Sequence, residues 1–389
     1  MKTLLKIQLA VFALVSASFT NIYLPQPVLP ILQSEFQISP VQASFAVSFV
    51  ILGIVLSNLF FGYLSDRYPV KPIIVVGGIF VAAGGFICSL THNYTVLVGS
   101  RLVQGLFIPA LTTSIAAWLA RTLPAKRLSV VMGSYVSATI LGGLGGRLLG
   151  GWIHPPLHWR YAFTTASVLI LVTTVMAVLI LPASGEKEIA DVRSSNGKET
   201  YFSLFKRKEL LLIYACGAGS LLIFSPVFNY LPYRLSQSPF DLSTETITLV
   251  YLVYVLGIFL GPLAGRLSSR FGGGVMLLSS SVLLGASLML LLLPSITAVV
   301  VGLLGVCAGF FTIHTVAVVL LNRKLTCSHG KANALYVLFY YTGGWLGITG
   351  AGFAYEYAGW KGVIIFLAGF LIIPLSAGLL ERRIENRAI

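Results

Sequence analysis

Long apolar stretches alternate with short polar breaks along the whole chain. A helix that crosses the hydrocarbon core of a bilayer needs about 20 mostly apolar residues. The breaks carry turn and charge signals, such as Asp66-Arg67 and His154-Pro155. The pattern predicts an all-α membrane protein with twelve transmembrane helices, over residues 6–27, 42–64, 72–90, 96–119, 128–152, 160–182, 209–232, 245–267, 273–293, 296–321, 331–354 and 360–380.

Composition supports lipid as the solvent of most of the chain. Of the 389 residues, 57% are hydrophobic and only 10% are charged, whereas soluble domains contain roughly 25% charged residues. The balance is basic, with 26 Lys and Arg against 12 Asp and Glu. In a soluble protein this excess would suggest nucleic acid, but cytoplasmic loops of membrane proteins collect Lys and Arg. We therefore expect no nucleic-acid partner.

The basic residues also predict the orientation in the membrane. Most of them lie in alternate breaks on one side, while the opposite breaks contain only Arg160, Arg234 and Lys361. The positive-inside rule then predicts that both termini are cytoplasmic. An even number of helices agrees with this arrangement.

The chain divides into two related halves. The polar stretch 183–208 predicts a cytoplasmic linker between a six-helix bundle at 1–182 and a second at 209–389. Five short matches recur in order, at offsets that fall from 207 to 201; they pair Tyr23-Leu-Pro with Tyr230-Leu-Pro, Leu52-Gly-Ile with Leu256-Gly-Ile, Gly62-Tyr-Leu-Ser with Gly265-Arg-Leu-Ser, Gly142-Gly with Gly343-Gly and Trp159-Arg with Trp360-Lys. Parallel repeats of this kind predict pseudo-two-fold symmetry and a binding site near the midplane, where the halves meet.

The first of three motifs follows the second predicted helix. The run from Gly62 to Lys71 contains Asp66 and Arg67 and resembles the G-x-L-x-D-R-x-G-R-R/K loop of the major facilitator superfamily, although Pro69 replaces the usual glycine. The resemblance implies the twelve-helix major facilitator fold with two pseudo-symmetric bundles. It also implies that Gly62, Asp66, Arg67 and Lys71 form a latch that stabilises one conformation. A solvated turn is the alternative interpretation.

The second motif, Arg101-Leu-Val-Gln104-Gly105, resembles the R-x-x-Q-G sequence of the same superfamily. An arginine inside a membrane span is costly, about 2.5–3.5 kcal/mol at the helix centre on insertion scales, and it needs partners or water. Gln104 lies one turn further along the same helical face. In the drug:proton antiporter branch this position is tied to proton coupling, which the resemblance implies for Arg101. The alternative is an arginine that reaches the membrane surface.

The third motif runs from Gly142 through Gly146 and Arg147 to Gly151. It resembles the glycine motif associated with exporters, with Gly143 at the usual proline and Arg147 at the usual last glycine. This variant is similar to the YnfM-like inner-membrane transport proteins of the drug:proton antiporter branch. Glycines at this spacing favour close helix packing. We expect Gly142 and Gly146 to form a bending surface, and Arg147 to set substrate charge preference or shape a gate.

Titratable groups inside the spans are few. All twelve acidic residues lie in breaks, in the linker, in the tail or near helix ends. A buried carboxylate would attract a cation and take up a proton, so its absence argues against a dedicated exporter of cationic drugs. His314 is the one histidine well inside a span, where it could carry a proton or be a hydrogen-bonded core residue. We expect the substrate cavity to be lined by Asn21, Tyr23, Gln26, Asn229, Tyr230, His314, Tyr340 and Trp345.

The sequence contains no catalytic triad, P-loop or metal-ligand spacing. We therefore expect no enzyme activity, no catalytic residues, no cofactor and no metal, with a proton gradient as the energy source. The predicted function is proton-coupled efflux of a small anionic, zwitterionic or neutral organic molecule by alternating access, in a bacterial inner membrane and as a monomer. A proton-coupled importer or facilitator of a small anion or sugar is one alternative. A membrane sensor or scaffold without transport is the other.

Overall fold

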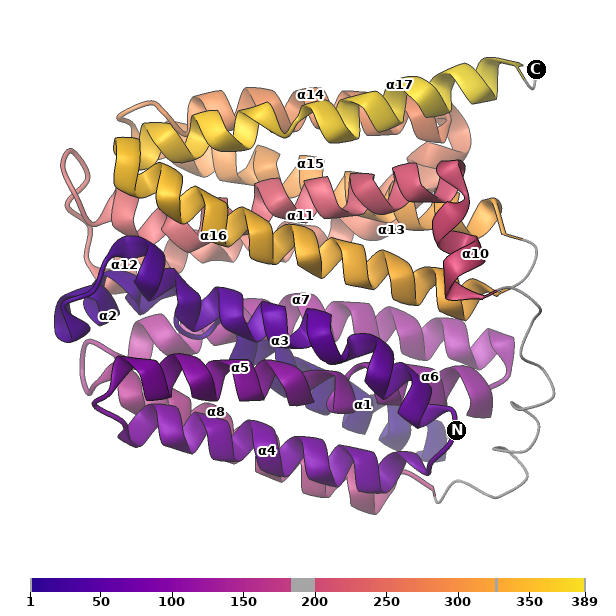
Figure 1. The fold of residues 1–389 in the computed structure, drawn as a ribbon, viewed down its shortest axis with the longest axis horizontal. Coiled ribbons are helices and arrows are strands. Elements are labelled where there is room, and N and C mark those ends of the chain that lie inside the picture. Colours follow the sequence, from indigo (N-terminus) through magenta and orange to yellow (C-terminus); the bar gives the residue numbers. More distant parts are fainter. Residues whose placement is uncertain (1, 183–199, 326–327, 388–389) are drawn as a thin grey trace. The chain divides into compact units, whose positions relative to one another are not determined.

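The computed structural model describes residues 2–182, 200–325 and 328–387, and the regular structure of these residues is helical throughout (Figure 1). The chain divides into two compact units. One, the N-terminal unit, comprises Met1–Gln37 and Phe45–Asn196; the other, the C-terminal unit, comprises Ile38–Ser44 and Gly197–Ile389. Most of the predicted linker, residues 183–199, lies outside the described residues.

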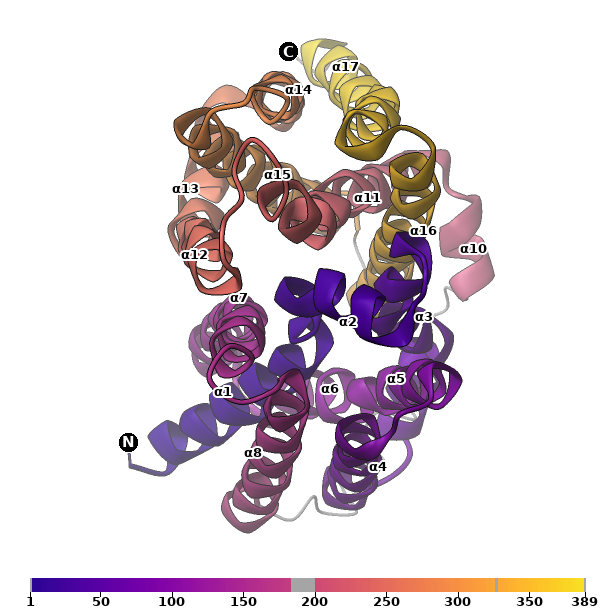
Figure 2. The same ribbon diagram turned by 90° about the vertical axis from the view of Figure 1, so that its left-hand side faces the viewer.

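The N-terminal unit is built from long helices that run side by side and short helices at their ends (Figure 2). In chain order these are α1 (Lys2–Tyr23), a 3₁₀ turn η1 (Gln26–Val28), α2 (Leu29–Phe36), α3 (Pro40–Ser65), α4 (Val70–Leu90), α5 (Tyr94–Leu111), α6 (Thr113–Thr122), α7 (Ala125–Ile153) and α8 (Trp159–Ile180). The start of α3 belongs to the C-terminal unit.

The C-terminal unit has the same organisation. It contains α10 (Tyr201–Lys206), α11 (Lys208–Leu235), α12 (Thr244–Val250), a 3₁₀ turn η2 (Tyr251–Val255), α13 (Leu256–Phe271), α14 (Gly273–Leu290), α15 (Ile296–Arg323), α16 (His329–Gly369) and α17 (Ile372–Arg387). In α16 the backbone leaves the helical region at Ala358 and Gly359, and Gly359 has φ +58°. A glycine is suited to that position because it adopts positive φ at little cost.

The predicted fold class is confirmed. Within the described residues, ten helical stretches are long and apolar enough to cross a membrane. One of them, Gly330–Arg387, has 58 residues and bends at Gly359, so it supplies both of the last two predicted spans. The predicted span 128–152 corresponds to α7, whose 29 residues extend over about 43 Å at 1.5 Å per residue. Its glycines and Arg147 lower the mean hydropathy of α7.

Glycines bring the helices of each unit into backbone contact. A Cβ atom at Gly142 or Gly146 of α7 would overlap the backbone of α1, at Ser16 and Thr20 respectively, and one at Gly150 would overlap the backbone of Leu24 just after α1. The repeat reproduces this contact in the C-terminal unit. There, Gly343 and Gly347 of α16 face the backbone of Ala218 and Leu222 in α11. The two glycine pairs differ by 201 positions and their contacts by 202, so the internal repeat of the sequence is also a repeat of helix packing.

Large apolar side chains on the outside of the helices are consistent with a lipid environment. Leu56, Leu179, Ile365 and Ile372 are more than 60% exposed. Exposing such an apolar surface to water is unfavourable, whereas exposing it to lipid tails carries no such free-energy cost. The same environment requires every backbone polar group to find a partner within the protein, which helices provide.

The glycine contact predicts that Gly146→Ala lowers the stability of the N-terminal unit. The added methyl group would push α7 away from the Thr20 carbonyl, and overpacking of this kind costs about 1–3 kcal/mol. Gly133→Ala is the matched control, because Gly133 lies in the same helix with open space around it. Thermal unfolding of the purified protein in detergent measures both. A melting temperature for Gly146→Ala equal to that of the control would contradict close α1–α7 packing.

Candidate functional site

Arg101 lies at the centre of the N-terminal unit. It belongs to α5, and its side chain is 0% exposed. Its Nε donates to the carbonyl of Ala46 at 2.6 Å, while its terminal nitrogens donate to the carbonyls of Asn21 and Ile22, each at 2.8 Å. One guanidinium therefore joins three helices, α1, α3 and α5. Its planar fork makes this possible, because an arginine presents five donors in fixed directions.

The end of α1 explains why Arg101 has carbonyls to bind. In an α-helix the carbonyl of Asn21 would accept from the N–H of residue 25. That residue is Pro25, which has no N–H, and helical order ends at Tyr23. The freed carbonyl is buried, where an unsatisfied polar group is costly. Arg101 supplies the missing donor.

Gln104 completes this network. Its Oε1 accepts from Arg101 at 2.6 Å, and its Nε2 donates to the carbonyl of Val81 in α4 at 2.8 Å and to Asn21 Oδ1 at 3.5 Å. The next residue, Gly105, lets α5 approach α3, because a Cβ there would overlap the Val50 carbonyl. The Arg101-Gln104-Gly105 motif thus holds four helices together. Its predicted role in proton coupling stays a prediction.

Arg147 is the second buried arginine of this unit, and it is 1% exposed. Its Nε donates to Gln26 Oε1 at 2.7 Å and one terminal nitrogen donates to the Gly143 carbonyl at 2.9 Å. The guanidinium carbon lies 4.4 Å from the centre of the Tyr23 ring, in a cation–π contact. The structure thus brings together three residues predicted separately for a gate and a cavity.

The long helices around these two arginines carry no acidic side chain. The helices α1, α3, α4, α5, α6, α7 and α8 contain no aspartate or glutamate. The hydrogen bonds of Arg101 and Arg147 given above go to neutral oxygens. In a medium of low dielectric constant the field of a charge is weakly screened, so the potential around Arg147 is positive.

The predicted latch residues lie together at the α3–α4 turn. Asp66 pairs with Arg121 at the end of α6 at 3.4 Å, and Arg121 also donates to the Ser65 carbonyl. Arg67 is exposed, and its guanidinium lies over the Tyr63 ring. Lys71 is the second residue of α4. Gly62 faces open space within the described N-terminal unit, because a Cβ built on it would have no neighbour within 4 Å outside its own helix. Latching remains a prediction for this group.

The predicted cavity residues of the C-terminal unit fall into two groups. His314 of α15 is partly buried; its Nδ1 shares a hydrogen bond with the hydroxyl of Tyr336 at 2.9 Å, and its ring lies 4.7 Å from that of Tyr340. Tyr230 lies in another group, where it stacks on Tyr355 and donates to the Ile348 carbonyl.

The two other predicted cavity residues of this unit differ in burial. Asn229 is fully buried in α11. Trp345 of α16 is partly buried, and its Nε1 is covered without a hydrogen-bond acceptor among the described residues. A buried donor without an acceptor is unusual, since buried donors are nearly always paired.

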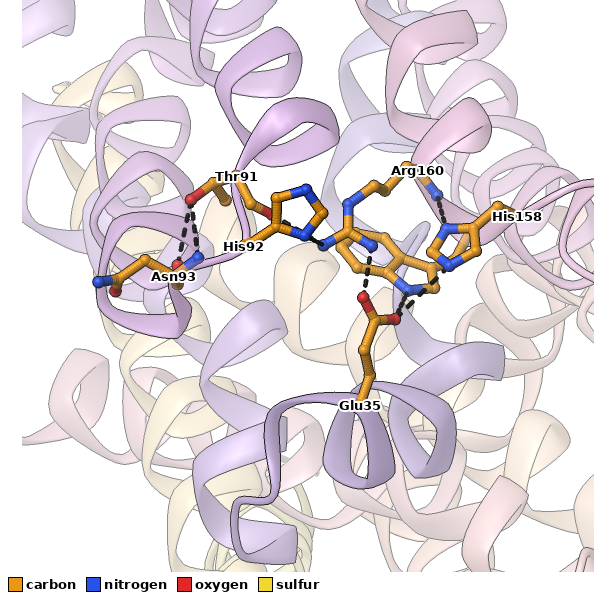
Figure 3. A network of polar contacts seen from close by, with 7 residues as sticks. Glu35, Thr91, His92, Asn93, His158 and Arg160 are labelled. Carbon is orange, nitrogen blue, oxygen red and sulfur yellow. Dashed lines mark hydrogen bonds and ion pairs between the residues drawn. The ribbon is translucent and has the colours of Figure 1, made fainter.

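A polar cluster at one end of the N-terminal unit surrounds Glu35 (Figure 3). Its carboxylate accepts from Arg160 and from Trp159 Nε1 at the start of α8, and His158 Nε2 lies 3.7 Å away. Arg160 also donates to the Thr91 carbonyl at 2.8 Å. The cluster ties α2 to the start of α8 and to the turn before α5.

Several of these contacts have no signal in the sequence. The charge distribution places Arg121 only among the basic residues of one side, and no pattern pairs it with Asp66. Tyr336 is one of the tyrosines of the second half that could line a cavity, but its hydrogen bond to His314 follows from the fold. Glu35 is expected near the membrane surface, and only the fold brings it to Arg160.

Comparisons with known proteins agree with this architecture. The Major Facilitator Superfamily model matches residues 11–325. The inner membrane transport protein YnfM of Escherichia coli is 30% identical over 382 residues, which cover 98% of this chain and 92% of that protein. A cis,cis-muconate transport protein of Acinetobacter baylyi is 23% identical over 252 residues, 62% of this chain and 61% of that one. A bacterial homologue of the human lysosomal transporter Spinster, in an inward-facing and occupied conformation, has a TM-score of 0.78 at 14% identity, with 97% and 96% coverage.

The hydrogen bonds of Arg101 predict that even a charge-conserving substitution is harmful. In Arg101→Lys a single ammonium replaces the fork and cannot reach α1 and α3 together. Charge-assisted hydrogen bonds contribute about 1.5–3 kcal/mol each, so we expect a clear fall in the melting temperature. Arg67→Lys, at an exposed arginine of the same unit, should leave it unchanged. Equal melting temperatures for both variants would contradict the role of Arg101 in joining the helices.

Proposed function

The chain belongs to the Major Facilitator Superfamily, and we propose that it exports a small organic anion across the bacterial inner membrane in exchange for protons. Membership of the family makes the chain a multi-pass membrane transporter of a small molecule, rather than an enzyme. Anion selectivity, proton coupling and outward direction are our proposal. We also infer cytoplasmic termini from the distribution of basic residues, and a monomer as the working unit.

The observation that carries the anionic substrate is Arg147 in its acid-free surroundings. A fully buried guanidinium in helices without carboxylates favours a negatively charged ligand and opposes a cation. Its neighbours Tyr23 and Gln26 add polar groups that can orient such a ligand. The cis,cis-muconate transport protein, whose name specifies a dicarboxylate, supports the same substrate class.

The movement of the transporter is proposed to use the α1–α7 contact. Arg101 and Gln104 hold α1, α3, α4 and α5 together, so these helices can move as one body. The glycine face of α7 offers a smooth surface against α1, at which a helix can bend or slide. Its resemblance to the glycine motif of exporters supports the outward direction.

His314 is the proposed proton carrier. Helices α1, α3 to α8 and α13 to α15 contain no aspartate or glutamate, and an imidazole can take up and release a proton. The hydrogen bond to Tyr336 and the contact with Tyr340 give His314 a defined orientation in the C-terminal unit. Protonation of His314 makes both ring nitrogens donors and so changes its hydrogen bond with the tyrosine hydroxyl, which is a way to couple charge to conformation.

Substitution of Arg147 tests the substrate class. In proteoliposomes with an internal pH-sensitive dye, we expect carboxylates such as muconate, but not organic cations or sugars, to cause proton movement. Arg147→Gln should lower this response at least tenfold, because it removes the positive charge, whereas Arg147→Lys should retain part of it. The amount of inserted protein is the control. An unchanged response to carboxylates in Arg147→Gln would reduce Arg147 to a packing role.

Substitution of His314 tests the energy source. His314→Asn should abolish accumulation driven by a pH gradient, because asparagine cannot take up the proton. Substrate exchange across equilibrated membranes should continue, because it requires no net proton movement. Wild-type transport that ignores the pH gradient would sink the antiport proposal and favour a facilitator. If substrate and protons instead enter the same compartment together, the protein is a proton-coupled importer.

A further inference from the structure

The C-terminal unit contains a polar cavity of about 180 Å³ next to the end of α11. Its walls come from three places that are distant in the sequence. Arg234 and Gln237 lie at and after the end of α11, Leu292 follows α14, and Tyr355, Trp360 and Lys361 flank the kink of α16. The positive φ of Gly359 turns the chain at this kink and so brings Lys361 to the cavity.

Arg234 brings a guanidinium group to the wall of this cavity. Its guanidinium carbon lies 4.9 Å from the centre of the Phe240 ring, which fixes the plane of the fork. Its Nε is buried and has no hydrogen-bond acceptor among the described residues. Buried donors are paired in more than nine of ten cases, and a missing partner costs about 1–3 kcal/mol.

The charge of the cavity points to an anion. Within the described parts of the chain, neither Arg234 nor Lys361 takes part in an ion pair. Both belong to the few basic residues on the side that the positive-inside rule leaves poor in Lys and Arg. Trp360 and Lys361 also open the helical segment after Gly359, and a helix N-terminus carries a partial positive charge.

The internal repeat indicates which anion fits. Trp159-Arg160 in the N-terminal unit corresponds to Trp360-Lys361 in the C-terminal unit. In the first repeat the basic residue holds the carboxylate of Glu35. In the second repeat Trp360 Nε1 donates to the Leu291 carbonyl at 2.8 Å, and the basic residue lines the cavity instead. Among the described residues, Lys361 therefore lacks the ion pair with a protein carboxylate that its counterpart Arg160 makes.

We propose that this cavity binds the carboxylate of a small soluble organic anion, between Arg234 and Lys361. Its volume is below the roughly 300–1,000 Å³ of pockets for drug-sized ligands, so it accommodates one acidic group or a short dicarboxylate. Gln237 and Tyr355, which are hydrogen-bonded to each other, add neutral polar groups to the wall. The site goes beyond the proposed transport function, because binding here requires neither transport nor a proton gradient.

Calorimetric titration of succinate onto the full-length protein tests the site. The protein is placed in nanodiscs of phosphatidylcholine, which carries no net charge. Arg234→Gln combined with Lys361→Gln should weaken succinate binding at least tenfold. Arg234→Lys combined with Lys361→Arg should retain most of the affinity, because both charges persist. Arg270→Gln is the matched control, since Arg270 is also a cation over a phenylalanine ring in this unit but lies outside the cavity.

Two results would overturn the proposal. One is equal succinate affinity in the wild type and in the double glutamine variant. The other is loss of wild-type binding in nanodiscs that contain phosphatidylglycerol, since an anionic lipid headgroup would then occupy the site. The titration does not involve transport, so its failure leaves the proposed transport function untouched. Failure of the proteoliposome assays would likewise leave this site untouched.

Discussion

The N-terminal unit depends on the hydrogen bonds that Arg101 donates to backbone carbonyls. Lipid offers no water to satisfy a broken helix end, so a chain that interrupts a membrane helix must supply its own donor. Pro25 frees the Asn21 carbonyl, and Arg101 occupies it while also binding Ala46 of α3. The same hydrogen bonds lower both the cost of burying the arginine and the cost of breaking α1. The position of α1 relative to α3 and α5 follows from this exchange.

Close backbone contact is the second constraint, and it is present twice. Between helices in lipid the hydrophobic effect gives little attraction, so association relies on packing that small residues permit. Gly142 and Gly146 place α7 against α1, and Gly343 and Gly347 place α16 against α11. The two repeats therefore share the same kind of close contact between a glycine and a helix backbone. The same surfaces that allow tight packing are free of side chains that would resist sliding.

The distribution of charge links the fold to its chemistry. Among the described residues, Asp66 and Glu35 each hold an arginine near a helix end, and the buried Glu381 of α17 pairs with Lys324. The interior contains Arg147 and the imidazole of His314. An interior of this kind is suited to an anion and to a proton carried by a base rather than by an acid. Such an interior favours the proposed anionic substrate over the cations that buried carboxylates attract.

Apolar runs of about twenty residues, basic breaks and motifs such as Gly62–Lys71 are local signals, so the membrane helices, the two repeats and the family could be predicted from sequence. Arg101 and Arg147 also stood out as unusual, because a charge in a span is costly wherever it points. The groups that these charges contact were visible only in the folded chain. The Asn21 carbonyl, the Tyr23 ring and the pairing of Glu35 with Arg160 lie many residues from their partners, and no periodicity encodes such contacts. The cavity at Arg234 has the same origin, since three separate chain segments form it.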